Sequence, residues 1–253
     1  MSTLLLVDDP AAGVRRLRLN RPERANALSR ALVADLITAL GDVEEDEAIR
    51  CVVLAAAGRT FCGGADLDEH FVSAGDEPDI GLSPLWERLG ELRVPVIAAV
   101  QGHAVTGGFL LAYSCDLIVA AADAVFRDTH AVLGLIPTGG ESQRLPRLVG
   151  AFAARDLMLT SRPLPAEEAA RIGLVSAVVE PAELDRAALE LAATIASASP
   201  RSVQAIMQLI NRGLRGDREA GLALERSVNR DGAANLDPDP ERERRLERFR
   251  SGR

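Results

Sequence analysis

Two continuous apolar runs, each followed by a glycine-rich stretch, constrain the fold of this chain most strongly. The runs are "IRCVVLAAA" (49–57) and "VPVIAAV" (94–100), and the stretches are "FCGGADL" (61–67) and "GHAVTGGFLL" (102–111). A short apolar run with β-branched residues is typical of a strand that is buried on both faces, as in a sheet covered by helices. The sequence therefore predicts an α/β core in which something approaches the backbone closely at the glycines.

The remaining patterns alternate between strand and helix. Alternating apolar residues predict a strand over 13–20, and helical spacing after Ser29, a predicted N-cap, predicts a helix over 30–46. Ser83 as N-cap and Pro84 at the first helical position predict a helix over 83–93. A further helix is expected to begin at the glycine pair of "TGGFLL".

Short strands are predicted for "DLIVAA" and "AVF", and helices dominate from residue 139 onward, interrupted by "LVSAVVE". This order predicts an α/β core over 1–199 and a helical region over 200–253, with the boundary at "SASP". The last segment, 240–253, carries charges on nearly every face, with Leu246 and Phe249 as anchors. It fits either a solvated helix or a helix that docks on a partner subunit.

Composition excludes several classes of function. The chain has 253 residues, 47% of them hydrophobic, which is enough for a sizeable core. A net charge of −8, with acids and bases mixed along the chain, argues against non-specific binding to nucleic acid or to an anionic membrane. No run approaches the roughly 18 apolar residues that span a bilayer, and the N-terminus lacks signal-peptide features. We therefore expect a cytoplasmic protein.

The three cysteines, Cys51, Cys62 and Cys115, are widely spaced and form no CxxC pair. Neither a disulfide framework nor a zinc site is indicated, so we expect buried reduced thiols and no metal.

The glycine stretches could form a binding site or simple turns. The first amides of a helix lack intrahelical partners and carry partial positive charge, so they can hold a carbonyl oxygen that becomes an oxyanion. One amide from each stretch would make a two-donor hole. Neither stretch matches GxGxxG or a Walker A loop, which argues against dinucleotide and nucleoside triphosphate sites.

Several motifs in one order resemble those of the crotonase (enoyl-CoA hydratase/isomerase) superfamily. They are "LNRPERANALS", "FCGGADL", "PVIAAVQGHAVTGG", "CDLIVAAADAVF" and "LGLIPTGGESQRLPRLVG". The resemblance implies a spiral of ββα units, with C-terminal helices that help to build a homotrimer or a dimer of trimers. It also implies an acyl-CoA thioester substrate, with coenzyme A as part of the substrate and no separate cofactor.

The resemblance also implies site residues. The two backbone amides that hold the thioester oxygen correspond to Ala65 and Gly107. The implied substrate-binding positions are Arg24, Ala65, Asp66, Leu67, Gly107 and Leu110. Arg24 is expected to meet the phosphates of coenzyme A or to be a solvated surface residue, and Asp66 to cap the helix that follows it.

At its acid–base positions the chain departs from the hydratase pattern. The family's hydratases use two glutamates, which correspond to Leu110, three residues after Gly107, and to His130, twenty residues further on. Leu110 cannot transfer a proton, so ordinary hydration is doubtful. The arrangement usual in the family's isomerases, which keeps the second glutamate, is not met either. The nucleophilic aspartate of the dehalogenase branch would fall on Thr138.

His130 is the remaining candidate for a catalytic acid or base, because imidazole titrates near neutral pH. Asp128 could orient the ring from an extended segment. The alternative is a structural histidine that lines the pocket. Other polar candidates, each with a structural alternative, are Glu141, His70, Tyr113 and His103, while Trp86, Phe109 and Leu110 suggest an apolar pocket.

Three hypotheses follow. The first is an acyl-CoA enzyme that stabilises an enolate at Ala65 and Gly107 and catalyses isomerisation, decarboxylation or thioester hydrolysis with His130. The second is an acyl-CoA-binding protein without turnover. The third is a structural subunit with a vestigial pocket.

Overall fold

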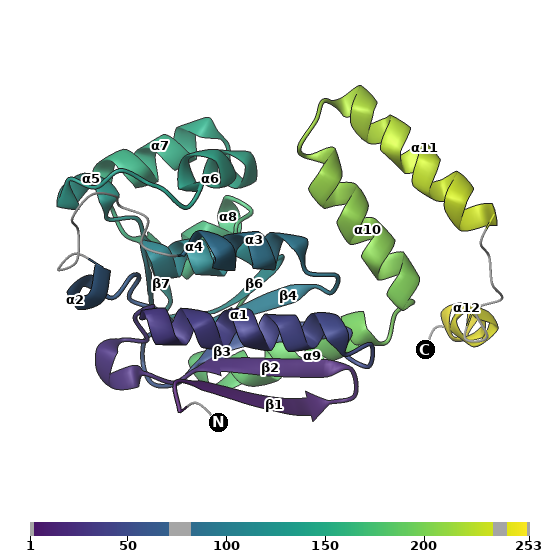
Figure 1. Cartoon of the computed structure of the whole chain (residues 1–253), viewed down its shortest axis with the longest axis horizontal. Coiled ribbons are helices and arrows are strands. Elements are labelled where there is room, and N and C mark those ends of the chain that lie inside the picture. The colour runs from purple at the N-terminus through teal and green to yellow at the C-terminus, as the bar shows by residue number, and fades with distance from the viewer. Residues whose placement is uncertain (1–2, 71–81, 235–241, 252–253) are drawn as a thin grey trace. The chain divides into compact units, whose positions relative to one another are not determined.

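A six-stranded sheet forms the centre of the larger of two units into which the chain divides, Met1–Thr194 and Ile195–Arg253 (Figure 1). The computed structural model describes residues 3–70, 82–234 and 242–251. The strands lie in the order β1 (Leu5–Ala11), β2 (Val14–Leu19), β3 (Cys51–Ala56), β4 (Val96–Val100), β6 (Leu117–Ala121) and β9 (Ala177–Val179).

The predicted apolar strands are confirmed as the interior of this sheet. β2, β3, β4, β6 and β9 pair in parallel, and only β1 is antiparallel to its neighbour. Every residue of β4, and all but the last of β3, is buried. A parallel sheet with helices on its faces leaves no solvated side, which explains why these strands are continuously apolar.

A smaller sheet and short helices turn the chain into repeated ββα units. β5 (His103–Val105), β7 (Val125–Arg127) and the two-residue β8 (Leu164–Pro165) form the small sheet. β4 continues into β5 and then α4 (Gly107–Ser114), while β6 continues into β7 and then α5 (His130–Leu133). Each unit thus gives one strand to each sheet before its helix, which is the expected spiral.

Helices α1 (Arg30–Glu45), α3 (Ser83–Glu91) and α4 pack side by side in the larger unit (Figure 1). The Ser29 cap is confirmed, because its hydroxyl accepts a hydrogen bond from the Leu32 amide at 3.2 Å. The Ser83 cap is wrong by one residue. Leu82 occupies the N-cap, since its carbonyl accepts from the Leu85 and Trp86 amides, and Ser83 is already helical.

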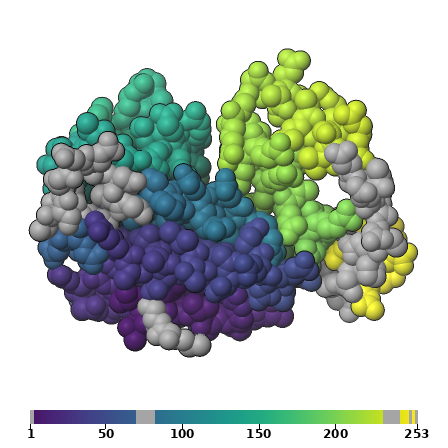
Figure 2. Space-filling model, viewed as in Figure 1, coloured from purple at the N-terminus to yellow at the C-terminus, as the bar shows by residue number. Residues whose placement is uncertain are grey.

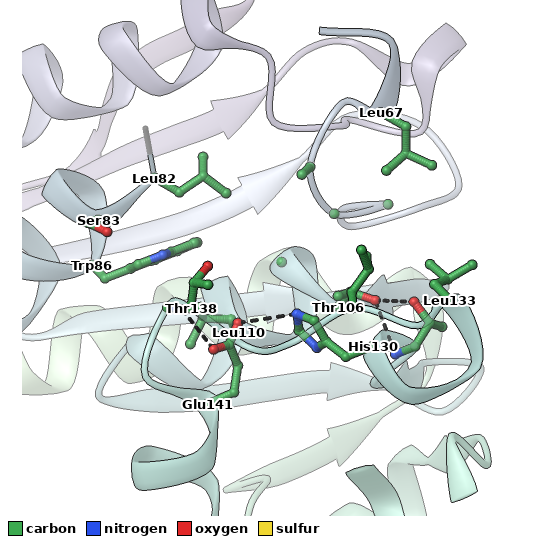
Figure 3. Close-up of a pocket in the computed structure, with 17 residues that line it drawn as sticks. Leu67, Leu82, Ser83, Trp86, Thr106, Leu110, His130, Leu133, Thr138 and Glu141 are labelled. Atoms are coloured by element: carbon green, nitrogen blue, oxygen red, sulfur yellow. Dashed lines mark hydrogen bonds and ion pairs between the residues drawn. The ribbon is translucent and has the colours of Figure 1, made fainter. Parts of the chain in front are cut away.

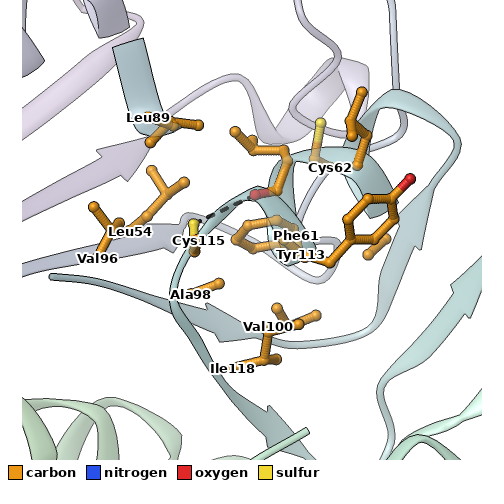
Figure 4. Close-up of a cluster of buried hydrophobic side chains, with 14 of the residues drawn as sticks. Leu54, Phe61, Cys62, Leu89, Val96, Ala98, Val100, Tyr113, Cys115 and Ile118 are labelled. Carbon is orange, nitrogen blue, oxygen red and sulfur yellow. Dashed lines mark hydrogen bonds between the residues drawn. The ribbon is translucent and has the colours of Figure 1, made fainter. Parts of the chain in front are cut away.

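Buried apolar side chains from both sheets and from helices that include α1, α3 and α4 make the core, and Figure 4 shows the part of it around β3, β4 and α4. All three cysteines are buried and unpaired, as predicted. The Cys115 thiol donates to the Leu111 carbonyl at 3.3 Å, and burial raises the pKa of Cys51 and Cys62 to about 12. In the space-filling view the segment from β1 through α1, coloured purple to dark blue, forms one continuous surface (Figure 2).

Helices make up most of the chain after β7, as predicted. They are α6 (Glu141–Val149), α7 (Ala151–Thr160), α8 (Ala166–Arg171), α9 (Leu184–Ala196), α10 (Pro200–Gly213), α11 (Arg218–Ala234) and α12 (Arg242–Arg250). Within the second unit α10 contacts α11, and Ile206 and Ile210 on α10 are exposed. The side chain of Phe249 lies outside the described residues, so docking of the last helix stays a prediction. Among the helices of described residues, none is long and apolar enough to cross a bilayer.

Candidate active site

Backbone pairing brings the two glycine stretches side by side. Cys62 forms a parallel bridge with Ala104: its amide donates to the His103 carbonyl at 3.1 Å and its carbonyl accepts from the Val105 amide at 2.9 Å. The start of α4 lies against the same carbonyl, since a Cβ built on Gly108 would be 2.1 Å from the Cys62 oxygen. Only glycine at position 108 allows this approach.

Within the described residues, this folding leaves the backbone amides of Ala65 and Gly107 without acceptors. Ala65 bridges Leu28 through its neighbours, because the Leu28 amide donates to the Gly64 carbonyl at 2.8 Å and the Asp66 amide donates to the Leu28 carbonyl at 3.2 Å. The Ala65 amide therefore points the other way. Gly107 supplies the first amide of α4, which has no intrahelical acceptor. Among the hydrogen bonds of the described residues, neither amide is a donor.

The Ala65 and Gly107 amides lie close together. A Cβ built on Gly107 would be 3.2 Å from the Ala65 nitrogen and 3.4 Å from the Gly64 Cα. The N-terminus of α4 adds partial positive charge there. Two unpaired donors so placed can stabilise an oxygen on which negative charge develops.

A cavity that opens to solvent is lined by both amide-bearing residues (Figure 3). Its walls are largely apolar, with a few hydroxyl groups, one imidazole and one carboxylate. The lining residues are Gly63, Gly64, Ala65, Leu67, Leu82, Ser83, Trp86, Thr106, Gly107, Leu110, Thr129, His130, Leu133, Leu135, Thr138, Gly139 and Glu141.

His130 lines this cavity beside Glu141 (Figure 3), and Asp128 contacts the other edge of its ring. Its Nδ1 is 2.9 Å from Asp128 Oδ1, and its amide donates to the same oxygen at 2.9 Å. Its Nε2 is 3.8 Å from Glu141 Oε1, and Glu141 Oε2 accepts from the Gly139 amide at 2.9 Å. The side chains of His130, Asp128 and Glu141 are only 12%, 2% and 5% exposed. The imidazole is therefore held with Nε2 toward Glu141.

The predicted contact between Asp128 and His130 is confirmed, but the predicted extended segment is wrong. Thr129 has ψ of 7°, and His130 begins a four-residue helix. Asp128 reaches the ring because its carboxylate also holds the His130 amide, which closes a tight turn of the kind aspartate favours.

Neighbouring carboxylates raise the pKa of His130. Burial alone lowers it, but the hydrogen bond with Asp128 and the negative charges of Asp128 and Glu141 raise it, and the result lies above the ordinary value of 6.5. The ring nitrogen Nε2 is thus a stronger base than that of a free imidazole.

Asp128→Asn is expected to lower the pKa of His130, because it removes the adjacent negative charge. Proton NMR titration of the imidazole measures this, with exposed His103 as an internal control. A raised folded-state pKa stabilises the fold fully below the unfolded value of 6.5, and this contribution is lost as pH rises through the raised pKa. The variant should therefore lose stability relative to the wild type mainly on the acidic side of that window. An unchanged His130 titration would contradict the assigned pairing.

Leu110 presents an apolar surface to the cavity. It is buried, and its Cδ2 would be 2.4 Å from a Cβ built on Gly139. The same Cβ would lie 2.9 Å from Trp86 Nε1 and 3.2 Å from Glu141 Oε1. Because Gly139 has no side chain, Leu110, Trp86 and the Glu141 carboxylate can all approach its Cα. Leu110 itself has no group that can transfer a proton.

Of the predicted substrate-binding residues, Leu67 and Leu110 line the cavity together with the two amide-bearing residues. Leu67 is 54% exposed. Arg24 is an exposed residue whose Nη2 pairs with Asp68 at 2.9 Å. Asp66 is buried, and its carboxylate pairs with Arg21 at 3.0 Å. Within the described part of the chain, Arg24 and Asp66 do not line the cavity, and their roles stay predictions.

The other polar candidates lie in different surroundings. Tyr113 is buried in edge-to-face contact with Phe109, at a ring-centroid distance of 4.9 Å, and burial raises the pKa of the phenol well above its usual value. His103 is exposed on β5. Neither lines the cavity in the part of the chain that the structure describes. The side chain of His70 is outside the described residues.

Glu141, which the sequence offered as a polar candidate with a structural alternative, lines the cavity beside His130. It begins α6, where an acid that satisfies the helix dipole is common, so the pattern offered a sufficient structural explanation. The available signal was a glutamate where the resembling family commonly has a small residue. Its proximity to His130 depends on the loop between α5 and α6.

Comparison with known proteins agrees with this architecture. Residues 9–243 match the enoyl-CoA hydratase/isomerase family. The chain is 40% identical over 224 residues to a probable peroxisomal enoyl-CoA hydratase 1 of Arabidopsis thaliana, covering 88% of this chain and 84% of the relative. It is 39% identical over 225 residues to the 1,2-epoxyphenylacetyl-CoA isomerase of Escherichia coli K12, covering 86% of each. The crystal structure of an enoyl-CoA hydratase from Bacillus anthracis superposes with a TM-score of 0.91, at 35% identity, over 99% of this chain and 97% of that one.

Proposed function

Because the chain belongs to the enoyl-CoA hydratase/isomerase family, we propose that it binds an acyl-CoA thioester and shifts the double bond of its acyl group by proton transfer. The observation that carries this proposal is the asymmetry of the cavity. Leu110 offers no acid or base, while His130 and Glu141 lie 3.8 Å apart on its wall. Hydration by the family's glutamate pair needs acids at both positions, whereas double-bond migration needs one acid–base group.

In the proposed reaction, the thioester oxygen accepts hydrogen bonds from the amides of Ala65 and Gly107. His130 Nε2 removes a proton from the α-carbon of a β,γ-enoyl thioester. The electron pair spreads over the three carbons and the thioester oxygen, where the two amides stabilise the charge. The proton then returns at the γ-carbon and leaves the conjugated α,β-enoyl thioester.

The carboxylates assist this cycle from both sides of the ring. Asp128 fixes the tautomer by accepting from Nδ1, so that Nε2 carries the lone pair. Glu141, near Nε2, stabilises the imidazolium that forms. Coenzyme A enters as part of the substrate, without a separate cofactor. We expect the chain to work as a homotrimer or a dimer of trimers through its C-terminal helices.

Two substrates test the proposal. A β,γ-enoyl-CoA should be converted to the conjugated thioester, which is followed by the rise in enoyl-thioester absorbance. Crotonyl-CoA is already conjugated. This chain should hydrate it at least about 10²-fold more slowly than a hydratase with both glutamates does, since a general acid–base contribution of that size is missing at Leu110. Rapid hydration would overturn the proposal.

Binding measured in the same preparation separates the alternatives. Tight binding of both thioesters without any product would favour an acyl-CoA-binding protein. Undetectable binding of both would favour a structural subunit.

A further inference from the structure

Thr106, which joins β5 to α4, has a backbone conformation that threonine rarely adopts. Its φ is 51° and its ψ is −105°. A β-branched residue at positive φ is strained, and such strain persists only where the surrounding structure enforces it. Glycine would adopt this conformation at little cost. The presence of threonine therefore needs an explanation in its side chain.

The Thr106 side chain is bound to the segment that carries His130. Its Oγ1 lies 2.5 Å from the Thr129 hydroxyl and accepts from the Thr129 amide at 3.2 Å. The backbone is held as well: the Thr106 amide donates to the Arg127 carbonyl at 2.8 Å, and its carbonyl accepts from the Leu110 amide at 2.8 Å. Contacts with both α4 and the β7–α5 segment thus enforce the strained conformation.

These contacts do not suit a nucleophile. A strained strand-to-helix turn with a hydroxyl residue, followed by an oxyanion-binding amide, is the geometry of a nucleophile elbow. An attacking hydroxyl needs a neighbouring base. In the described part of the chain, the hydrogen-bond partners of Thr106 Oγ1 are the hydroxyl and the amide of Thr129, and neither is a base.

We propose that this hydroxyl pair, the Thr106–Thr129 clasp, positions the oxyanion-binding amide relative to the acid–base group. Thr106 immediately precedes Gly107, and Thr129 immediately precedes His130. Both clasp residues line the cavity. The clasp therefore joins the α4 segment to the α5 segment one residue before the Gly107 amide and one residue before His130. The distance between these two groups sets the reaction geometry. This inference rests on the proposed function. Thr106 and Thr129 are positioning residues rather than catalytic residues.

The direct readout is the carbonyl stretching frequency of an isotope-labelled butyryl-CoA thioester bound at saturation. This saturated thioester has no double bond to shift, so the measurement does not depend on turnover. Two donors at the oxygen should lower the frequency on binding. Thr106→Val and Thr129→Val keep the branched shape without the hydroxyl and should lose most of that lowering. Thr106→Ser and Thr129→Ser should retain it, and Thr38→Val, on the exposed side of α1, is the matched control.

Kinetics give the second readout. Each valine variant should lower kcat by about 10²-fold with little change in KM, because misplacement of about 1 Å has an effect of that size. The double variant should be no worse than either single one, since both remove the same contact.

The outcomes are distinct. Valine variants with the wild-type frequency would overturn the clasp, even if they melt at a lower temperature. No lowering in the wild type would overturn both the oxyanion assignment and the clasp. If the wild type lowered the carbonyl frequency of bound butyryl-CoA but did not isomerise a β,γ-enoyl-CoA, only the proposed reaction would be overturned. The frequencies in the variants would still test the clasp.

Discussion

His130→Ala is expected to lower turnover of a β,γ-enoyl-CoA by about 10²–10⁴-fold, the usual contribution of a general acid–base group. Binding of the thioester should persist, because the amides of Ala65 and Gly107 and the apolar wall are untouched. Steady-state kinetics and calorimetric titration with a non-reacting acyl-CoA measure the two effects separately.

His103→Ala is the matched control for this variant, since His103 is exposed on β5. It should keep wild-type turnover. If His130→Ala also kept wild-type turnover, His130 would have no part in the mechanism. Loss of both turnover and binding in His130→Ala would indicate a structural histidine instead.

Gly108→Ala is expected to destabilise the fold by about 3 kcal/mol or more, because it overpacks a rigid backbone contact. The new Cβ would lie 2.1 Å from the Cys62 oxygen and 2.7 Å from its carbonyl carbon, so α4 or the segment around Cys62 must shift. The shift moves the Gly107 amide, and loss of one oxyanion donor lowers kcat by about 10²–10³-fold. Denaturant unfolding and kinetics on the folded fraction measure both effects.

Gly41→Ala is the matched glycine-to-alanine control, within α1. A Cβ there would meet nothing within 4 Å, so this variant should gain about 0.5–1 kcal/mol from helix propensity. Wild-type stability and turnover in Gly108→Ala would contradict the close approach of α4 to the Cys62 carbonyl.

Elements whose pattern is set locally could be predicted from the sequence. The runs around Val53 and Ala98 are apolar on both faces because parallel strands are covered on both sides, and the structure confirms them. β1 (Leu5–Ala11) was not predicted. Five of its seven residues are exposed, so it lacks the apolar run that identifies the central strands.

Features that depend on contacts between distant segments could be predicted only in part. The glycine pairs indicated a close backbone approach, but the parallel bridge of Cys62 with Ala104 defines which amides meet. The resemblance placed His130 at an acid–base position, and the sequence alone placed Asp128 near it. No local pattern links Thr106 to Thr129, or Glu141 to His130, because each pair is joined by loops whose geometry the sequence pattern does not specify.

The central claim is that the two amides and His130 together move a proton on a bound acyl-CoA, rather than only holding it. The most direct test is proton NMR of a β,γ-enoyl-CoA in deuterated water, with the wild type and with His130→Ala. The wild type should introduce deuterium at the α- and γ-carbons as the double bond moves, and the variant should bind the thioester without doing so. Bound thioester with neither exchange nor isomerisation in the wild type, or equal exchange in both proteins, would contradict the account.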